Sequence, residues 1–552
     1  MNFSPDVKIM PSLFRPNFQA LSGGTLGSVF TRRAGAILAW LGLAGCYALV
    51  TLPLLLRYPP VWPDEALFAS PSDSLASGNG MGTPVLAGFI PGMDRYTFWL
   101  PPGYFLALAA LFRIFHPVNQ VLVMRLFSWS LGAALLGICW SILRRISPRS
   151  GMVWLSLLLL ATHVTLIRAA NLGRMDMLTL VCGTASVALY LEFLEREGSR
   201  WAAGAGFLAG LAFLCHPAGA VFFAALAANH LMSAGLKSFA KPQARLFFGS
   251  FLVPLLPWLI YLLRAPGLFL LQFGGQFNRK ASTAGTLLIH EPAARWLIRP
   301  LQFTEWGPKG PLTFSDLLYV FVFLVAVLLL AFSGREKTRA SVLGLWVLAG
   351  YFLNLATLED WYPIYFVVPM VLLLGWGAAS TQYPWARAIG VAALLVGIAW
   401  NVVQAELVLK GPFGDWKAYR KYASALAAQI PAGSKVILMA IPDPYFGLQM
   451  ENKGYRLYEF APEGIPVDPA LAPKTLASTD YAVDSGCCGP RYLRPYLESH
   501  GRIVGGVMSP DRNSPPVMVW KLQDSAVRRP EPPGIHHRKS EPGASQHKSS
   551  SR

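Results

Sequence analysis

The stretch Tyr58-Pro59-Pro60-Val61-Trp62-Pro63-Asp64-Glu65-Ala66-Leu67-Phe68-Ala69 places two adjacent carboxylates just after the first long apolar run of the chain. Prolines and aromatic residues frame the pair, and most of the chain from there to residue 407 is apolar. Acidic residues are favoured at the start of a helix. Asp64 and Glu65 alone therefore fit a solvated loop or a helix start as well as they fit a functional site, and the rest of the chain has to decide.

The composition indicates a polytopic α-helical membrane protein. Of the 552 residues, 54% are hydrophobic and only 14% are charged. Apolar runs of about 20 residues, the length that a bilayer core requires, recur between residues 34 and 407. The net charge of +18 does not predict nucleic acid as a partner, because much of it lies in short loops, where basic residues set membrane orientation.

The apolar runs predict about eleven membrane spans. We expect them near residues 34–56, 120–143, 151–170, 174–194, 201–214, 217–236, 245–263, 312–332, 340–357, 361–379 and 386–407. Another apolar segment, 100–115, begins with Pro101-Pro102-Gly103, contains Arg113 and is short for a span. We expect it to lie in the outer membrane interface or to dip into it, and a short tilted span is the alternative.

Basic residues in the short loops decide between these two topologies. If 100–115 does not cross, the basic loops all face the inside, as the positive-inside rule requires. These loops are 144–149, 195–200, 237–245, 334–339 and Arg387. If the segment did cross, every assignment would invert. The sequence therefore predicts that Asp64, Glu65 and the C-terminal region lie on the extracytoplasmic side of the cell inner (plasma) membrane.

Composition also divides the chain into domains. The expected parts are a flexible cytoplasmic leader over 1–33, a transmembrane domain over 34–407, an extracytoplasmic α/β domain over 408–524 and a disordered tail over 525–552. Two long outer loops are expected within the transmembrane domain. They cover 57–119 and 264–311, and the second has the aromatic and basic content of an interfacial lid.

The α/β domain is predicted from its periodicity. Helices are expected over 416–430, 444–452 and 491–500, and strands over 435–440, 481–485 and 517–522. Cys487 and Cys488 follow the second of these strands, and in an oxidising compartment they are able to form a strained vicinal disulfide or to remain without a partner.

Polar residues gather at the outer ends of the predicted spans and in the first outer loop. Beside Asp64 and Glu65, they are Arg95, Arg168, Arg174, Asp176 and His216. Ionisable groups at membrane depth are costly and usually functional. A carboxylate there can act as a general base, and the arginines can bind a phosphate leaving group. A leaving phosphate at a membrane surface indicates a lipid-linked donor.

Two of these features have simpler interpretations. Arg174 and Asp176 also fit a local pair that caps the start of a helix. His216 also fits a turn residue before Pro217, where the helical conformation is disfavoured.

The ordered series of motifs resembles the GT-C superfamily of integral-membrane glycosyltransferases, in particular the bacterial protein O-mannosyltransferase and lipid A aminoarabinose transferase group (glycosyltransferase family 39/83-like). The likeness extends from about residue 34 to 407. The motifs that carry it are Trp62-Pro63-Asp64-Glu65-Ala66, Leu100-Pro101-Pro102-Gly103-Tyr104, Arg125-Leu126-Phe127-Ser128, Arg144-Arg145, Arg174-Met175-Asp176-Met177, Gly210-Leu211-Ala212-Phe213-Leu214-Cys215-His216-Pro217-Ala218-Gly219 and Tyr362-Pro363-Ile364-Tyr365-Phe366-Val367-Val368-Pro369.

The resemblance implies a GT-C fold, a polyprenyl-phosphate sugar as donor, and transfer on the extracytoplasmic face to a lipid, a glycan or a protein. It assigns Asp64 as the catalytic base, with Glu65 and Asp176 as supporting carboxylates. Asp64 and Asp176 would hold a divalent cation (Mg, Mn or Zn) if one is used. The residues expected to bind substrate are Arg95, Arg168, Arg174, His216 and Tyr362.

This chain departs from its relatives near the expected donor phosphate. Many relatives have Lys or Thr-Lys where this chain has Cys215-His216, and an Arg where it has Trp361. The phosphate ligands are therefore open at this stage.

The sequence thus predicts a membrane hexosyl- or pentosyltransferase of the cell envelope. The alternative is a polytopic transporter or flippase for a lipid-linked or small solute, and a structural scaffold is a third interpretation. Transporters tend to bury ionisable residues at mid-membrane and to be built from inverted repeats. Here the span centres are nearly free of charge, and no inverted repeat stands out.

Overall fold

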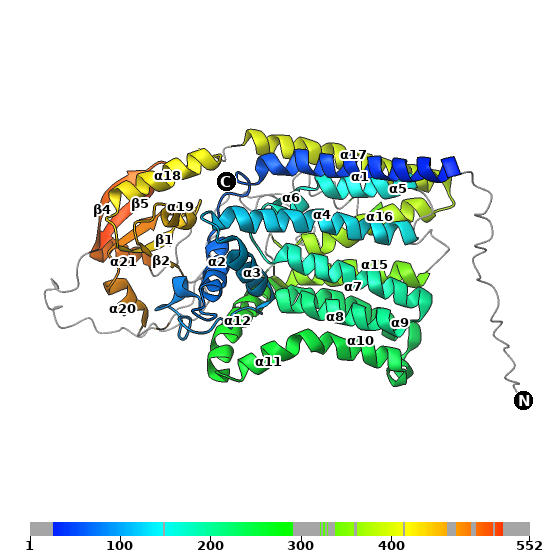
Figure 1. Ribbon diagram of the computed structural model, residues 1–552, viewed down its shortest axis with the longest axis horizontal. Coiled ribbons are helices and arrows are strands. Elements are labelled where there is room, and N and C mark those ends of the chain that lie inside the picture. The colour runs from blue at the N-terminus through cyan, green and yellow to red at the C-terminus, as the bar shows by residue number, and fades with distance from the viewer. Residues whose placement is uncertain are drawn as a thin grey trace, which may run out of the picture.

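Long helices run side by side in a bundle, and a small α/β domain lies at one end of it (Figure 1). The computed structural model describes residues 26–146, 150–290, 321, 324–325, 328, 337–357, 361–411, 414–460, 468, 471–486, 493–511 and 514–522. Helix α1 (Leu26–Thr51) begins at the end of the bundle away from the α/β domain. The loop over 57–119, which the sequence predicts to be the first outer loop, therefore emerges at the end where the α/β domain lies.

The predicted polytopic helical architecture is confirmed. The other bundle helices are α4 (Gln120–Ile146), α5 (Ser150–Thr162), α6 (Val164–Ala170), α7 (Asp176–Arg196), α8 (Ser199–Cys215), α9 (Ala220–Ala234), α10 (Pro242–Leu252), α11 (Leu256–Leu262), α15 (Lys337–Thr357), α16 (Ile364–Ser380) and α17 (Pro384–Lys410). In the described part of the chain, seven helical segments are long and apolar enough to cross a membrane, or eight if α5 and α6, bent by 59°, form one span.

The predicted spans over 201–214 and 361–379 correspond to α8 and α16, which are apolar but shorter. The predicted span over 312–332 lies almost entirely outside the described residues. Helix α16 is apolar on all sides, and every residue from Ile364 to Ala379 is buried. A helix that is hydrophobic all round belongs in the interior, and α16 accordingly packs against α5, α15 and α17.

Close contact between α8 and α10 depends on glycine. A Cβ at Gly206 would overlap the carbonyl oxygen of Phe247, and one at Gly210 would overlap the carbonyl oxygen of Phe251. Small residues four apart let two membrane helices approach to backbone contact, where van der Waals packing replaces the missing hydrophobic driving force. The backbones of α8 and α10 could not come this close with larger residues at these two positions.

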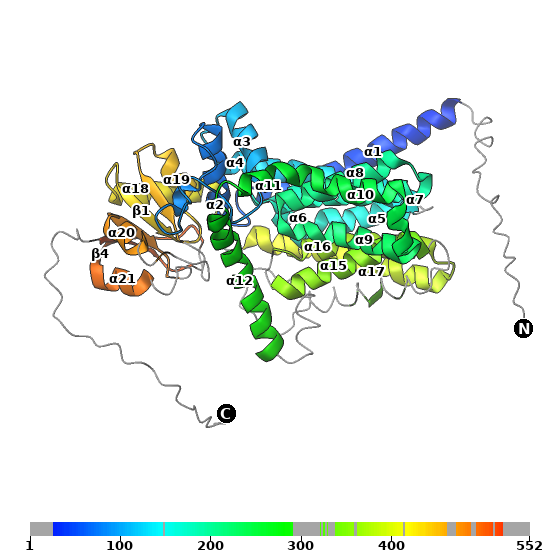
Figure 2. The same ribbon diagram turned by 90° about the horizontal axis from the view of Figure 1, so that it is seen from below.

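The first outer loop contains α2 (Pro63–Ala76), a 3-10 turn η3 (Pro84–Leu86) and α3 (Gly103–Phe115). Helix α3 has 13 residues, fewer than the roughly 20 that a span needs. This length agrees with the interfacial placement predicted for 100–115. Helix α12 (Pro266–His290) runs obliquely to the bundle helices beside α2 (Figure 2).

The C-terminal domain is a five-stranded sheet in the order β2-β1-β3-β5-β4. Strand β1 is parallel to β2 and β3, and β5 is antiparallel to β3 and β4. Its elements are α18 (Trp416–Gln429), β1 (Lys435–Met439), α19 (Tyr445–Met450), β2 (Arg456–Glu459), α20 (Leu471–Ala477), β3 (Tyr481–Asp484), α21 (Leu493–His500), β4 (Gly501–Val507) and β5 (Val517–Leu522). The predicted small α/β domain is therefore confirmed, and Cys487 and Cys488 lie outside the described residues.

The first outer loop and the C-terminal domain share one hydrophobic core. Phe68 and Phe89 of the loop belong to the same buried cluster as Ile437 and Tyr458 of the sheet. The rings of Phe89 and Tyr458 meet edge to face, with their centroids 6.1 Å apart. Hydrogen bonds reinforce this contact, and the Oγ1 of Thr475 donates to the carbonyl of Gly88 at 2.7 Å. The sheet thereby supports the loop that carries Asp64.

The close packing of α8 on α10 predicts that a glycine-to-alanine substitution has different effects on stability at Gly210 and at Gly249. Gly210→Ala should lower the thermal unfolding temperature of the detergent-purified protein, because overpacking typically costs about 1–3 kcal/mol. Gly249→Ala on α10, where a Cβ would meet nothing within 4 Å, should be neutral or stabilising, because alanine favours the helix by up to about 1 kcal/mol. Equal unfolding temperatures for the two variants would contradict the close α8–α10 contact.

Candidate active site

Helix α2 begins where the sequence places its helix-start signals. Trp62 is the N-cap with extended backbone, Pro63 occupies the first turn, and both acids follow there. The carboxylate of Glu65 accepts a hydrogen bond from the Trp62 backbone N–H at 3.1 Å. Successive residues on a helix point about 100° apart, so the two acids face different surroundings.

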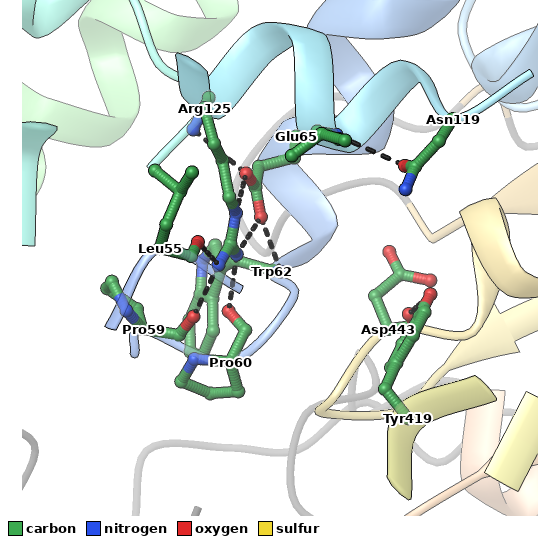
Figure 3. Close-up of polar contacts among 11 residues, drawn as sticks. Leu55, Pro59, Pro60, Trp62, Glu65, Asn119, Arg125, Tyr419 and Asp443 are labelled. Atoms are coloured by element: carbon green, nitrogen blue, oxygen red, sulfur yellow. Dashed lines mark hydrogen bonds and ion pairs between the residues drawn. The ribbon is translucent and has the colours of Figure 1, made fainter. Parts of the chain in front are cut away.

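Glu65 points into the protein and pairs with Arg125 of α4, and both side chains are fully buried. The guanidinium donates through Nε and Nη2 to the two carboxylate oxygens at 2.9 and 2.7 Å. Its remaining N–H groups donate to the carbonyls of Leu55, Pro59 and Pro60 at 2.9–3.2 Å (Figure 3). All five guanidinium donors are therefore used.

The same carboxylate also holds the start of the α7 segment. The Gly173 backbone N–H donates to Glu65 Oε1 at 2.8 Å. A Cβ at this glycine would come within 2.8 Å of the Met124 Cβ and 3.0 Å of the carboxylate oxygen. Glu65 thus joins the loop after α1, the start of α2, helix α4 and the residues before α7.

Asp64 faces the other way, toward Arg174 and Asp176. The guanidinium of Arg174 forms ion pairs with Asp64 through Nη1 and, at 3.0 Å, with Asp176 through Nε. The side chains of Arg174 and Asp176 are about 5% exposed, whereas that of Asp64 is 29% exposed. Asp176 also accepts a hydrogen bond from the hydroxyl of Tyr365 at 3.2 Å. Arg174 therefore bridges two carboxylates, and only Asp64 reaches open space.

Trp361 lies between two guanidinium groups. The Cζ of Arg168 is 4.2 Å and that of Arg174 is 4.6 Å from its ring centroid. Such cation–π contacts stabilise buried cations. Trp361 and Arg174 line both the main cavity and a small neighbouring one, and Arg168 and Asp176 lie on the side of the small one.

His216 fills the break between α8 and α9 and contacts Tyr362. Its Nδ1 accepts the Ala218 backbone N–H at 3.0 Å, so in the neutral ring the proton is on Nε2. This Nε2 lies 3.3 Å from the Tyr362 hydroxyl oxygen. His216 therefore donates to Tyr362, which retains its own hydroxyl proton for donation elsewhere.

These side chains meet at a cavity of about 530 Å³ at the end of the bundle where the α/β domain lies. Its lining comprises Trp62, Asp64, Leu67, Phe68, Trp99, Leu100, Arg174, Met175, His216, Pro217, Ala218, Phe273, Gln276, Phe277, Arg279, Lys280, Ala281, Leu353, Ala356, Thr357, Trp361 and Tyr362. The lining is largely aromatic and apolar with a few charged groups, as is typical of a ligand site.

Helix α12 contributes Arg279 and Lys280 to this cavity. Burial, together with the neighbouring positive charges of Arg279 and Arg174, lowers the pKa of Lys280 to about 7. Two cations held side by side in a partly buried cavity are unfavourable unless an anion joins them. This end of the cavity is therefore suited to a negatively charged group.

The structure brings together four of the predicted site residues in the cavity, namely Asp64, Arg174, His216 and Tyr362. Asp176 and Arg168 lie directly behind Arg174 and Trp361. Glu65 is buried away from the cavity. Arg95 is not brought to the site, since its side chain is 79% exposed and pairs with Asp94.

Arg279, Lys280 and Arg125 are functional candidates that the sequence analysis did not select. The signal for Arg125 was present, because an arginine within an apolar run is costly and demands a partner. For Arg279 and Lys280 the signal was their basic and aromatic segment, which was interpreted only as part of a lid.

The two carboxylates predicted as metal ligands are joined by an arginine. The Arg174 guanidinium lies between Asp64 and Asp176 and supplies the positive charge that a divalent cation would bring. Among the described residues, no group of three or more His, Cys, Asp or Glu side chains is arranged to hold a metal ion. This donor set does not fit a divalent site.

Comparison with known proteins gives a family match and two similar structures. The model of the dolichyl-phosphate-mannose-protein mannosyltransferase family matches residues 100–261. ArnT from Cupriavidus metallidurans in the apo state superposes with a TM-score of 0.53 at 15% identity, over 90% of this chain and 98% of that one. The archaeal oligosaccharyltransferase AglB from Archaeoglobus fulgidus, in complex with an inhibitory peptide and a dolichol-phosphate, superposes with a TM-score of 0.52 at 11% identity. This match covers 81% of this chain and 69% of that one. No curated protein sequence matches significantly.

These findings confirm the predicted resemblance to the GT-C superfamily. At such low identities the two structures show the fold, and the family match over 100–261 indicates a membrane glycosyltransferase.

From the buried Glu65–Arg125 pair we predict that a small change in the Glu65 side chain strongly lowers the stability of the fold. Glu65→Gln removes the negative charge but keeps the size, and it leaves a buried guanidinium without a counter-charge. Loss of one partner of a buried pair costs about 3–5 kcal/mol, which should appear as a marked fall in thermal unfolding temperature. Glu406→Gln is the matched control, because its ion pair with Lys410 is exposed, and exposed ion pairs contribute little to stability. Similar effects of both substitutions would be evidence against the structural role of Glu65.

Proposed function

We propose that this chain, which has the GT-C fold, transfers a sugar from a polyprenyl-phosphate carrier to a nucleophile on the extracytoplasmic face of the plasma membrane. The observation that carries the proposal is that Asp64 of α2 and the cations Arg279 and Lys280 of α12 line the same cavity. The protein in the similar archaeal structure binds a dolichol-phosphate, and the family description names a dolichyl-phosphate sugar. Both support a lipid-phosphate donor.

Asp64 acts as the general base in this proposal. Its Oδ2 is held by Arg174, so Oδ1 is the oxygen that takes the proton of the acceptor hydroxyl or amine. A fixed carboxylate within reach of the nucleophile contributes typically about 10²–10⁴-fold to the rate. The deprotonated acceptor attacks the anomeric carbon, the bond from that carbon to the phosphate oxygen breaks, and the lipid phosphate leaves from the opposite face.

Arg279 and Lys280 bind the departing phosphate. Arg174 does not supply this charge, because it is already neutralised by two carboxylates. Arg279 and Lys280 line the same cavity as Asp64, and the Nζ of Lys280 lies 5.8 Å from the ring centroid of Tyr362. Positive groups fixed where negative charge develops lower the barrier without reorganisation. The Tyr362 hydroxyl, oriented by His216, donates to the same phosphate.

The apolar part of the cavity suits the rest of the donor. Phe273 and Phe277 of α12 and Leu353 and Ala356 of α15 line the same cavity, and in this proposal their apolar surface accommodates the first units of a polyprenyl chain. Trp62 and Trp99 offer flat faces for a sugar ring. The acceptor is a lipid, a glycan or a protein that approaches from the outer water layer.

The base assignment predicts that Asp64→Asn abolishes sugar transfer while the protein still inserts and folds. The amide has the same shape but cannot accept the proton, so kcat should fall by about 10²–10⁴-fold. Turnover of a radiolabelled polyprenyl-phosphate sugar by purified protein measures this, and thermal unfolding checks the fold. Asp94→Asn, an exposed acid of the same outer loop, should retain normal activity. A near-normal kcat in Asp64→Asn would contradict the assignment of Asp64 as the general base.

From the lowered pKa of Lys280 we predict that donor binding depends on pH. Its pKa of about 7 means that the ammonium is charged below that pH and neutral above it, whereas a phosphodiester keeps its charge throughout. The KM for the donor should therefore rise as the pH increases through 7. In Lys280→Arg the guanidinium stays protonated, so the rise should disappear while the pH dependence of kcat remains. An unchanged KM profile in this variant would show that Lys280 does not bind the phosphate.

A further inference from the structure

Two buried carboxyl groups lie at the edge of the sheet that faces the first outer loop. Asp443 follows β1, and Glu459 ends the neighbouring parallel strand β2, paired in register with Leu438. Each residue is only 1% exposed. The carboxyl ends of parallel strands are the usual place for functional groups in α/β folds, yet the proposed transfer reaction does not use this pair.

The hydrogen bonds of this pair are incomplete. Asp443 Oδ1 accepts the Tyr445 backbone N–H at 2.8 Å. Within the described part of the chain, no donor group reaches Asp443 Oδ2 or either Glu459 oxygen, and the two carboxyl groups lie within hydrogen-bonding reach of each other. Two ionised carboxylates buried together would be very costly. One shared proton converts this repulsion into an O–H···O hydrogen bond between the two groups.

The described residues around the pair do not supply a compensating cation. Glu65 and Asp73 of α2 add negative charge nearby, and Tyr419, Tyr422 and Tyr445 present neutral phenols. Asp484 at the end of β3 is already bonded to the Gly486 N–H at 2.7 Å. Burial and mutual repulsion accordingly raise the pKa of both Asp443 and Glu459.

Asp443 is also the point where the sheet holds the loop that carries Asp64. Its backbone N–H donates to the carbonyl of Val61 at 2.8 Å, three residues before Asp64. Its own carbonyl accepts the Tyr419 hydroxyl at 2.7 Å. Figure 3 shows Asp443 and Tyr419 on the α/β domain, across from Trp62 and Glu65. A displacement of Asp443 would therefore pull on the residues that precede Asp64.

We propose that Asp443 and Glu459 are positioning residues for the base: with one proton shared between them they hold the C-terminal domain against Val61, and loss of that proton separates the strand ends and displaces the Asp64 loop. The catalytic part of this inference rests on the proposed glycosyltransferase function. The docking part stands without it. The pair does not touch the cavity, so it acts on kcat through Asp64 and not on donor binding.

The sign of the pH effect comes from linkage between proton binding and folding. The folded pair binds a proton more tightly than unfolded carboxyl groups, whose pKa is about 4. Stability then falls as the pH rises, because the folded state holds more protons than the unfolded state over this range. The loss begins above about pH 4 and continues up to the raised pKa values of the pair. Ordinary ion-paired carboxylates give the opposite slope.

The experiment compares thermal unfolding and kinetics of the full-length protein, purified in detergent, across pH 5 to 9. The variants are Glu459→Gln and Asp443→Asn, whose amides keep a hydrogen-bond donor between the two groups at every pH. Glu498→Gln, an exposed acid of the same domain, is the control. Wild type and Glu498→Gln should lose unfolding temperature and kcat toward pH 9, with the donor KM of both changing in parallel.

The two amide variants should lose less unfolding temperature and less kcat than wild type toward pH 9, while their donor KM follows the wild-type profile. Both variants are measured, so that the test can still be made if one of them does not fold. If the folded variants keep the wild-type slopes of unfolding temperature and kcat, the proton-sharing pair is refuted. If the unfolding slope is reduced as expected but wild type shows no sugar transfer at any pH, the docking role of the pair stands and the proposed function fails.

Discussion

The buried pair of Arg125 and Glu65 is the interaction on which the site depends. One guanidinium uses all its donors on the carboxylate and on three carbonyls of the loop after α1. A buried ion pair adds little net stability, since desolvation offsets the attraction, but removing either partner is very unfavourable. The main effect of the pair is therefore on the conformation of the loop after α1 and not on the net stability of the protein. The loop has one arrangement in which both charges are satisfied, and that arrangement turns Asp64 toward the cavity.

Adjacent acids thus take different roles because a helix separates their directions. Glu65 faces α4 and forms a buried ion pair with Arg125, whereas Asp64 faces Arg174 and open space. The sheet adds a second support from the opposite side, through the shared core and the Val61 contact. Asp64 is consequently held between two parts of the chain that are distant in sequence.

The sequence predicted what depends on local pattern. Apolar run length located the helices, the change of composition after residue 407 located the α/β domain, and the polar span ends supplied Asp64, Arg174 and His216, which meet in one cavity. It missed β2 and β4, which lie at the two edges of the sheet, and β4 is in addition glycine-rich and largely exposed. The residue pattern did not separate the roles of Asp64 and Glu65, which only the family resemblance assigned, and it did not exclude Arg95, because both depend on the direction of side chains in the folded protein.

The positive side of the cavity is where tertiary structure changes the interpretation most. Sequence alone drew attention to Arg168 and Arg174 and to the loss of expected basic residues at His216 and Trp361. In the structure, Arg174 is neutralised by two carboxylates and Trp361 stacks on both arginines. Arg174 therefore holds Asp64, Arg168 packs on Trp361, and two further cations of the cavity, Arg279 and Lys280, come from α12, about 215 residues after Asp64 in the chain. Asp64 and the α12 cations are thus carried by separate elements, so the distance between them depends on how α12 lies against α2.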